Sequence, residues 1–207
     1  SLAPPDAHWQ SCEWRRLASF FAHPTRYIME QRLGVFLRTF FEPIEDRESF
    51  LLDALERYRI NQKILAALLA GKTAKENYPA IRASGMLPHG TVGKVIYGSL
   101  NDDVEEYLRT MVALIPNDEP RNAQVEVEMP PFSISGSIDA LYPQARIVYL
   151  LSNAHPKDLL SAFIGHLAIL LAPLGDLPKT TILLCKHAIW RFGPVEEPES
   201  VLRDYLT

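Results

Sequence analysis

Cysteine is scarce in this sequence, since Cys12 and Cys185 are its only two. The 6 histidines include no pair at a metal-ligand spacing on one expected helix, so neither a disulfide framework nor a zinc site is expected. So few cysteines fit a reducing, cytoplasmic setting. The longest apolar run, near residues 167–174, is far shorter than the roughly 20 residues that cross a bilayer, which excludes a transmembrane helix and a membrane partner.

An excess of basic residues is missing as well. Lysine and arginine number 21 against 25 aspartates and glutamates, which leaves a formal net charge of −4. Because neutralisation of phosphates supplies most non-specific affinity for nucleic acid, the chain alone should bind DNA poorly. Hydrophobic residues make up 47% and charged residues 22%, a balance that is typical of a soluble globular protein with a sizeable core.

Apolar residues recur at helical spacing in the first half of the chain. Residues 13–33 should form two short helices, with Pro24 opening the second because proline lacks an amide donor and restricts the residue before it. The clearest helix is expected from Leu51 to Gly71. The other expected elements here are a loop at 41–49, a long turn at 82–93, an amphipathic helix at 95–111 and a linker at 116–121.

Beyond the linker the apolar period changes to two, which predicts strands. Three adjacent strands are expected at 125–129, 132–142 and 145–152, then a buried helix at 158–172, a strand at 180–186 and a helix that begins at 199. The three strands should form a meander, with the largely apolar third strand inside the sheet. The predicted fold class is α/β (α+β): one domain, with a helical part at about 11–115 and a sheet-centred part, a mixed sheet flanked by helices, at about 122–207.

Several familiar catalytic motifs are absent. Gly71-Lys72-Thr73 ends a helix and lacks the earlier glycine of a phosphate-binding loop, so an ATP site is not expected there and Gly71 is better interpreted as a helix C-cap. Neither Ser84 nor Ser137 lies in a G-x-S-x-G elbow. His166 lies in an apolar helix and is expected to be a core residue.

Four segments, in this order, carry a family resemblance: FFAHP, QRLGV, LERYRINQ and RASGMLPHGTVG, all within residues 17–93. Their order resembles the entry helices of RecB/AddB-type nuclease domains and is closer to the RecC branch of that group, the gamma subunits of exodeoxyribonuclease V. The resemblance implies a restriction-endonuclease-like mixed sheet with an N-terminal helical region. It also implies that the final helix continues past Thr207.

A second segment, GSIDALYPQARIVYLLSN at residues 136–153, is similar to the strand pair of PD-(D/E)xK nucleases. In that class, one strand ends in G-x-x-D and the next carries a second acid and a lysine, which together hold Mg²⁺ and position the attacking water. Asp139 matches the first acid. The second acid falls at Tyr149, the lysine at Leu151, and the histidine of the preceding helix near Asp53. These four residues should meet at one strand end as a decayed site without a metal, although Asp139 also fits a simple strand-end turn.

Basic residues on two expected helices are candidates for contact with single-stranded DNA: Arg26, Arg32, Arg57, Arg59 and Lys63. Rings that could stack on bases lie nearby at Tyr27, Phe40 and Tyr58. The alternative for each cation is a solvated helix face paired with acids such as Glu30 and Glu56.

The resemblance implies a non-catalytic DNA-guiding and scaffolding domain of a RecBCD-type helicase-nuclease in double-strand break repair. Its partners would be RecB-like and RecD-like subunits together with DNA ends and single-stranded DNA. ATP and Mg²⁺ would belong to the partner subunits, so that no cofactor is expected here. The alternatives are an active metal-dependent DNA exonuclease with an unconventional set of acids, and a protein-interaction domain that never touches nucleic acid.

Overall fold

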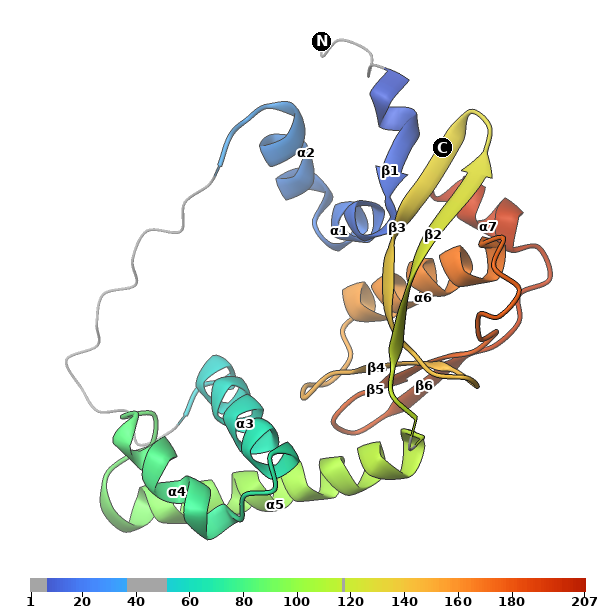
Figure 1. Ribbon diagram of the computed structural model, residues 1–207. Coiled ribbons are helices and arrows are strands. Elements are labelled where there is room, and N and C mark those ends of the chain that lie inside the picture. The colour runs from blue at the N-terminus through green and yellow to red at the C-terminus, as the bar shows by residue number, and fades with distance from the viewer. Residues whose placement is uncertain (1–6, 37–51, 117) are drawn as a thin grey trace. The chain divides into compact units, whose positions relative to one another are not determined.

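The computed structural model describes residues 7–36, 52–116 and 118–207, and the chain divides into two compact units (Figure 1). Residues 1–38 and 116–207 make up the sheet unit, and residues 39–115 make up the helical unit. The first helices of the chain therefore pack with the sheet, whereas the apolar pattern grouped them with the helices that follow. A contact between segments far apart in sequence cannot be deduced from that pattern.

The sheet unit contains a six-stranded mixed sheet. Its strands are β1 (Ser11–Glu13), β2 (Arg121–Met129), β3 (Phe132–Leu141), β4 (Arg146–Tyr149), β5 (Thr181–Leu184) and β6 (Ile189–Phe192). The order is β1-β3-β4-β5-β6, and β2 pairs with β3. The β2–β3, β3–β4 and β5–β6 pairs are antiparallel, while β1 is parallel to β3 and β4 is parallel to β5.

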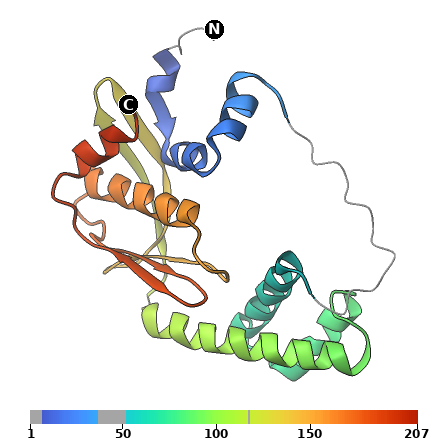
Figure 2. The ribbon, with the colours of Figure 1, turned by 180° about the vertical axis from the view of Figure 1, so that it is seen from behind.

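The sheet unit also contains helices, some of which pack on the sheet and some on other helices (Figures 1 and 2). They are η1 (Ala7–Gln10), α1 (Trp14–Ala22), α2 (Pro24–Arg32), α6 (Pro156–Leu171) and α7 (Pro198–Asp204). α6 contacts β2, β3 and β5, and both α1 and α7 pack on α6. The core between them includes Leu17, Ile134, Ile138, Leu167 and Leu202. This burial fixes α1 beside the carboxyl-terminal half of β3, where Trp14 and Arg15 contact Ser137 and Asp139.

The helical unit contains α3 (Ala54–Leu69), α4 (Ala74–Ala83) and α5 (Gly90–Leu114), with α5 packed against α3 and α4. α3 and α4 each begin with a capping box, in which an N-cap side chain and a glutamate three residues later satisfy each other's backbone amides. In α3 the pair is Asp53 and Glu56, and in α4 it is Thr73 and Glu76. The helix ends are therefore set by local hydrogen bonds.

Most expected elements are confirmed. Pro24 opens the second of two short helices, the three central strands form a meander, β4 lies inside the sheet between β3 and β5, and α6 is a buried helix. The α/β class of the fold is also confirmed. α4 and the short strands β1 and β6 were not predicted, and the loop expected at 41–49 lies outside the described residues.

Candidate functional site

An irregularity in β3 sets the direction of Asp139. The register between β2 and β3 shifts between Arg121 and Ala123, and Ala140 has a φ of 56°. Such a β-bulge inserts a residue on one strand and can re-aim a neighbouring side chain. Asp139 reaches Arg146 on β4 and Arg15 on α1, so its carboxylate lies on the side of the sheet that the helices cover.

Two arginines hold the Asp139 carboxylate. Arg15 Nη2 lies 3.2 Å from Asp139 Oδ2, and Arg146 Nη2 lies 3.7 Å from Asp139 Oδ1. The Asp139 side chain is 56% exposed, whereas that of Arg146 is 5% exposed. Burial lowers the pKa of the Arg146 guanidinium, the Asp139 carboxylate raises it in part, and the Arg15 charge lowers it further. Each carboxylate oxygen therefore has a cationic partner.

The ring of Trp14 supports both guanidinium groups. The Arg15 and Arg146 Cζ atoms lie 4.8 and 5.2 Å from the Trp14 ring centroid, which is within cation–π range. Trp14 Nε1 donates a hydrogen bond of 3.2 Å to the Ser137 carbonyl oxygen, which ties the ring to β3. Arg146 Nε and Nη1 are buried and have no hydrogen-bond partner in the described part of the protein, so the indole face is a main contact of this cation.

Two glycines leave the space for this cluster. A Cβ on Gly165 of α6 would lie 2.5 Å from Arg146 Nη1, and a Cβ on Gly136 of β3 would lie 2.9 Å from Trp14 Cδ1. Gly136 also has a φ of 138°, a conformation that side chains rarely adopt. The glycine of the G-x-x-D motif thus has a structural role here, because it admits the indole ring between β3 and α1.

β4 presents apolar side chains beside Asp139. Val148 and Leu150 pack against the buried cluster of Ala162, Leu183 and Cys185, on the same side of the strand as Arg146. Because alternate residues of a strand share a face, Arg146, Val148 and Leu150 form one row. The β4 row on the same face of the sheet as the Asp139 carboxylate therefore carries one cation and two aliphatic side chains.

Tyr149 and Leu151, where the motif spacing put the second acid and the lysine, belong to the alternate row of β4. The Tyr149 side chain is 48% exposed, and Leu151 is half-buried just after the strand. Burial first, and then the neighbouring Tyr149, raises the pKa of the Tyr142 phenol. The strands of Asp139 and Tyr149 are antiparallel neighbours, as expected, but the direct partners of the Asp139 carboxylate are the two arginines.

Asp53, close to the position where the motif alignment put the helix histidine of the nuclease class, is the N-cap of α3 in the helical unit. Its Oδ1 accepts a 2.6 Å hydrogen bond from the Glu56 amide, and its own amide donates a 2.9 Å hydrogen bond to the Glu56 carboxylate. Asp53 is thus engaged in starting a helix. Among the residues that the structure describes, no group of three or more histidine, cysteine, aspartate or glutamate side chains could hold a metal ion.

The candidate DNA-contacting residues of α2 line two cavities. Arg26 lines a cavity of about 340 Å³ and lies 2.8 Å from Glu30 through its Nε atom. Arg32 lines an adjoining cavity of about 660 Å³. Phe40, one of the expected stacking rings, lies outside the described residues.

The candidate residues of α3 fall on two sides of that helix. Arg59 and Lys63, four residues apart, line a cavity of about 480 Å³ together with Met86. Arg57 Nε instead donates a 3.3 Å hydrogen bond to the Leu52 carbonyl oxygen, close to the start of α3. Arg59 and Lys63 therefore form a local pair of cations, and Arg57 is turned toward the preceding segment.

The residues that sequence reasoning missed are Trp14, Arg15, Arg16 and Arg146. Only Arg146 carried a signal, because it is a charged residue at the start of an otherwise apolar strand. Arg15 lies 124 positions from Asp139 in sequence, so its role depends on how α1 packs.

The fold and this site define an α/β domain with a helix-covered mixed sheet, in which arginines hold the strand-end carboxylate. The chain belongs to the RecC C-terminal domain family, whose sequence model matches residues 9–207. In the part of the chain that the structure describes, no helix is long and apolar enough to cross a membrane.

Curated relatives agree with this family assignment. The chain is 25% identical over 185 residues to the RecBCD enzyme subunit RecC of Escherichia coli, an alignment that covers 89% of the chain and 16% of that protein. It is 22% identical to the subunit of the same name from Buchnera aphidicola (strain APS), over 92% of the chain and 18% of the relative. The Haemophilus influenzae subunit is 28% identical over 58% of the chain and 10% of the relative. The chain therefore spans less than a fifth of the length of these relatives.

Proposed function

We propose that this domain is a non-catalytic, DNA-guiding and scaffolding part of a RecBCD-type helicase-nuclease that acts in double-strand break repair. Its partners would be RecB-like and RecD-like subunits in the cytoplasm, together with DNA ends and single-stranded DNA. ATP hydrolysis and Mg²⁺-dependent cleavage would belong to those partners. The family assignment and the identity of the relatives as RecBCD enzyme subunits support this proposal.

The arginine pair on Asp139 carries the non-catalytic part of the proposal. A nuclease of the PD-(D/E)xK class needs carboxylate oxygens free to bind Mg²⁺ and a lysine beside the attacking water. Here both oxygens of Asp139 face guanidinium groups, at 3.2 and 3.7 Å. A divalent cation about 5 Å from each arginine would be repelled by roughly 7 kcal/mol per arginine at an effective dielectric constant of about 20.

The cationic cavities support the DNA-guiding part. Arg26 and Arg32 line one cavity each in the sheet unit, and Arg59 and Lys63 line a single cavity in the helical unit. The chain as a whole carries a net charge of −4, so these clusters would act locally and would not attract DNA from a distance. Weak binding by the chain alone and contact with DNA inside an assembled complex are both consistent with this arrangement.

A metal-binding and cleavage assay tests the non-catalytic role. Calorimetric titration of the chain with Mg²⁺ and with Mn²⁺ should show no binding at millimolar concentration, and labelled single-stranded and duplex DNA should stay intact. The matched variant is Asp139→Ala, which removes the single acid of the motif. DNA cleavage by the parent chain that Asp139→Ala abolishes would establish the alternative, a metal-dependent exonuclease.

A further inference from the structure

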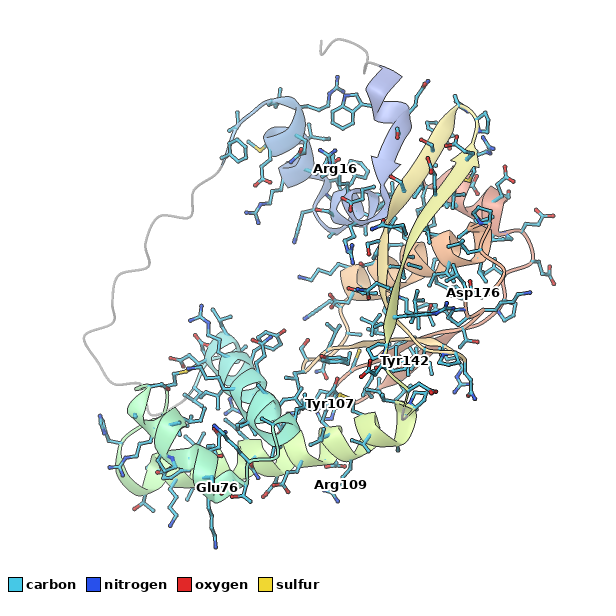
Figure 3. All side chains as sticks on the ribbon, in the orientation of Figure 1. Arg16, Glu76, Tyr107, Arg109, Tyr142 and Asp176 are labelled. Atoms are coloured by element: carbon cyan, nitrogen blue, oxygen red, sulfur yellow. The ribbon has the colours of Figure 1, made fainter. Side chains whose placement is uncertain are left out.

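Two cavities adjoin at the corner between α1 and α2, and both are lined by Arg16 and Tyr27. The basic cavity, of about 340 Å³, is also lined by Arg15, His23 and Arg26. The aromatic cavity, of about 660 Å³, is also lined by Trp9, Phe20, Arg32, Phe132 and Tyr205. Both cavities lie within the sheet unit, and Figure 3 labels Arg16 at α1.

The charge at this corner is opposite in sign to that of the whole chain. Four arginines line the two cavities, at positions 15, 16, 26 and 32, and the lining has one acidic side chain, Glu30. Arg15 also pairs with Asp139, which lies outside the lining. Glu30 pairs with Arg26, while Arg16 Nη2 donates a 3.0 Å hydrogen bond to the neutral Gln31 side chain. In a chain with a net charge of −4, this concentration of guanidinium groups favours an anionic ligand.

Half-buried aromatic rings line the second cavity and make it partly apolar. Phe20 and Tyr27 meet edge to face with ring centroids 5.6 Å apart, which keeps the Tyr27 ring in a fixed orientation beside Arg16. Trp9, Phe132 and Tyr205 are also half-buried around the same cavity. A planar, apolar group therefore fits this cavity, and an anionic group attached to it would reach the arginines.

We infer that the α1–α2 corner binds single-stranded DNA, with an unpaired base in the aromatic cavity and the adjacent phosphates against Arg16 and Arg26. Stacking surfaces next to a cationic track are the arrangement that binds single strands without regard to sequence. A paired base in duplex DNA is stacked on its neighbours and cannot enter the aromatic cavity. This inference rests on the proposed DNA-guiding function and assigns it a site.

The test compares three labelled ligands by fluorescence anisotropy with the full chain. The ligands are a short single-stranded oligothymidylate, an abasic strand of the same length and charge, and a duplex of the same length. The oligothymidylate should bind about tenfold more tightly than the abasic strand, since stacking one base on an aromatic side chain contributes on that order. The duplex should bind no better than the abasic strand.

Variants locate the site. Tyr27→Leu should weaken binding of the oligothymidylate about tenfold and leave binding of the abasic strand unchanged, whereas Tyr27→Phe, which keeps the ring, should bind as the parent does. Arg16→Gln should weaken binding of both single strands. Arg191→Gln and Trp190→Leu change exposed side chains of β6 that do not line these cavities, so both should leave binding unchanged.

Equal affinity for the oligothymidylate and the abasic strand would overturn the inference. Tighter binding of an acidic, tryptophan-containing peptide of the same net charge would also overturn it, and would assign the corner to a protein partner. Base-dependent binding that persists in Tyr27→Leu and Arg16→Gln would place the DNA site elsewhere and leave the proposed function intact. Failure of the proposed function itself would appear separately, as the absence of any crosslink between this chain and forked DNA in the assembled complex.

Discussion

At the scale of single residues, the Asp139 carboxylate is paired with positive charge that comes from arginine side chains. Two guanidinium groups supply the same formal charge of about +2 that a bound Mg²⁺ would supply. They come from α1 and β4, and the Trp14 ring and the two glycines around it hold them in place. Both oxygens of the Asp139 carboxylate thus have a protein side chain as their cationic partner.

His166 is a buried titratable residue whose hydrogen-bond partners are clear. Its ring is fully buried in α6, with Nε2 2.8 Å from the Gly193 carbonyl oxygen and Nδ1 3.0 Å from the Thr181 hydroxyl. A carbonyl oxygen can only accept, so Nε2 donates and the neutral ring accepts from Thr181 at Nδ1. His166 therefore joins α6 to β5 and to the segment after β6. This agrees with the core position that was expected from its apolar helix.

The His166 contacts predict that the chain loses stability at mildly acidic pH. Burial lowers the pKa of His166 from its ordinary value of 6.5, the hydrogen bond to Gly193 raises it in part, and the Arg146 charge lowers it further. Because the unfolded chain protonates first, the stabilisation is complete above pH 6.5 and is lost as pH falls toward the lower pKa of the folded protein. Thermal unfolding between pH 7.5 and pH 5.5 measures it.

The test variant is His166→Gln, and His187→Gln is its control. His166→Gln should lower the free energy of unfolding by about 1–3 kcal/mol at neutral pH, because buried partners lose hydrogen bonds, and should flatten its pH dependence. His187 is exposed, so His187→Gln should leave the pH profile as in the parent. An unchanged profile in His166→Gln would assign the acid sensitivity to other groups.

At the scale of elements, the features that depend on local sequence could be predicted. Pro24 separates α1 from α2, and alternating apolar residues place β2 and β3. α4 was missed even though Thr73 and Glu76 carry the spacing of a capping box. The bulge at Asp139 and the approach of Arg15 could not be predicted, because both result from how distant segments pack.

The start of α3 gives a prediction that belongs to the element as a whole. Asp53→Ala should lower the free energy of unfolding by about 0.5–2 kcal/mol, because it removes the acceptor for the Glu56 amide. Asp53→Asn should retain most of the stability, since an amide oxygen can still cap. Urea denaturation followed by circular dichroism measures both changes.

The matched control for this cap is Asp102→Ala, which changes an exposed aspartate in the middle of α5. Its effect should stay within about 0.5 kcal/mol of the parent. Equal losses of stability in Asp53→Asn and Asp53→Ala would show that the negative charge at the start of α3 matters more than the hydrogen bond. In that case the interaction of the carboxylate with the macrodipole of α3 would be the larger contribution.

At the scale of the whole molecule, the chain combines an acidic balance with cationic clusters in both of its units. The α1–α2 corner belongs to the sheet unit, and Arg59 and Lys63 belong to the helical unit. With a net charge of −4, long-range attraction of DNA is weak, so each cluster can act only on a strand that is already delivered to it. Guidance inside an assembled complex meets that condition.

The last prediction concerns the helical unit in the complex of the proposed function. Replacing Arg59 and Lys63 together with alanine should reduce the unwinding of DNA ends, because both cations line one cavity. The chain should stay folded, since changes of exposed basic residues usually cost little stability. Arg57→Ala is the matched control, because the Arg57 side chain turns toward Leu52, and its effect on unwinding should be smaller. The defect in unwinding should persist as salt is raised, since a partly enclosed contact is screened less than a free surface.

Unwinding and subunit assembly are measured separately in the complete complex. Unchanged unwinding in the double variant would remove α3 from the DNA path, whereas lost assembly would identify this face as a contact with a partner subunit.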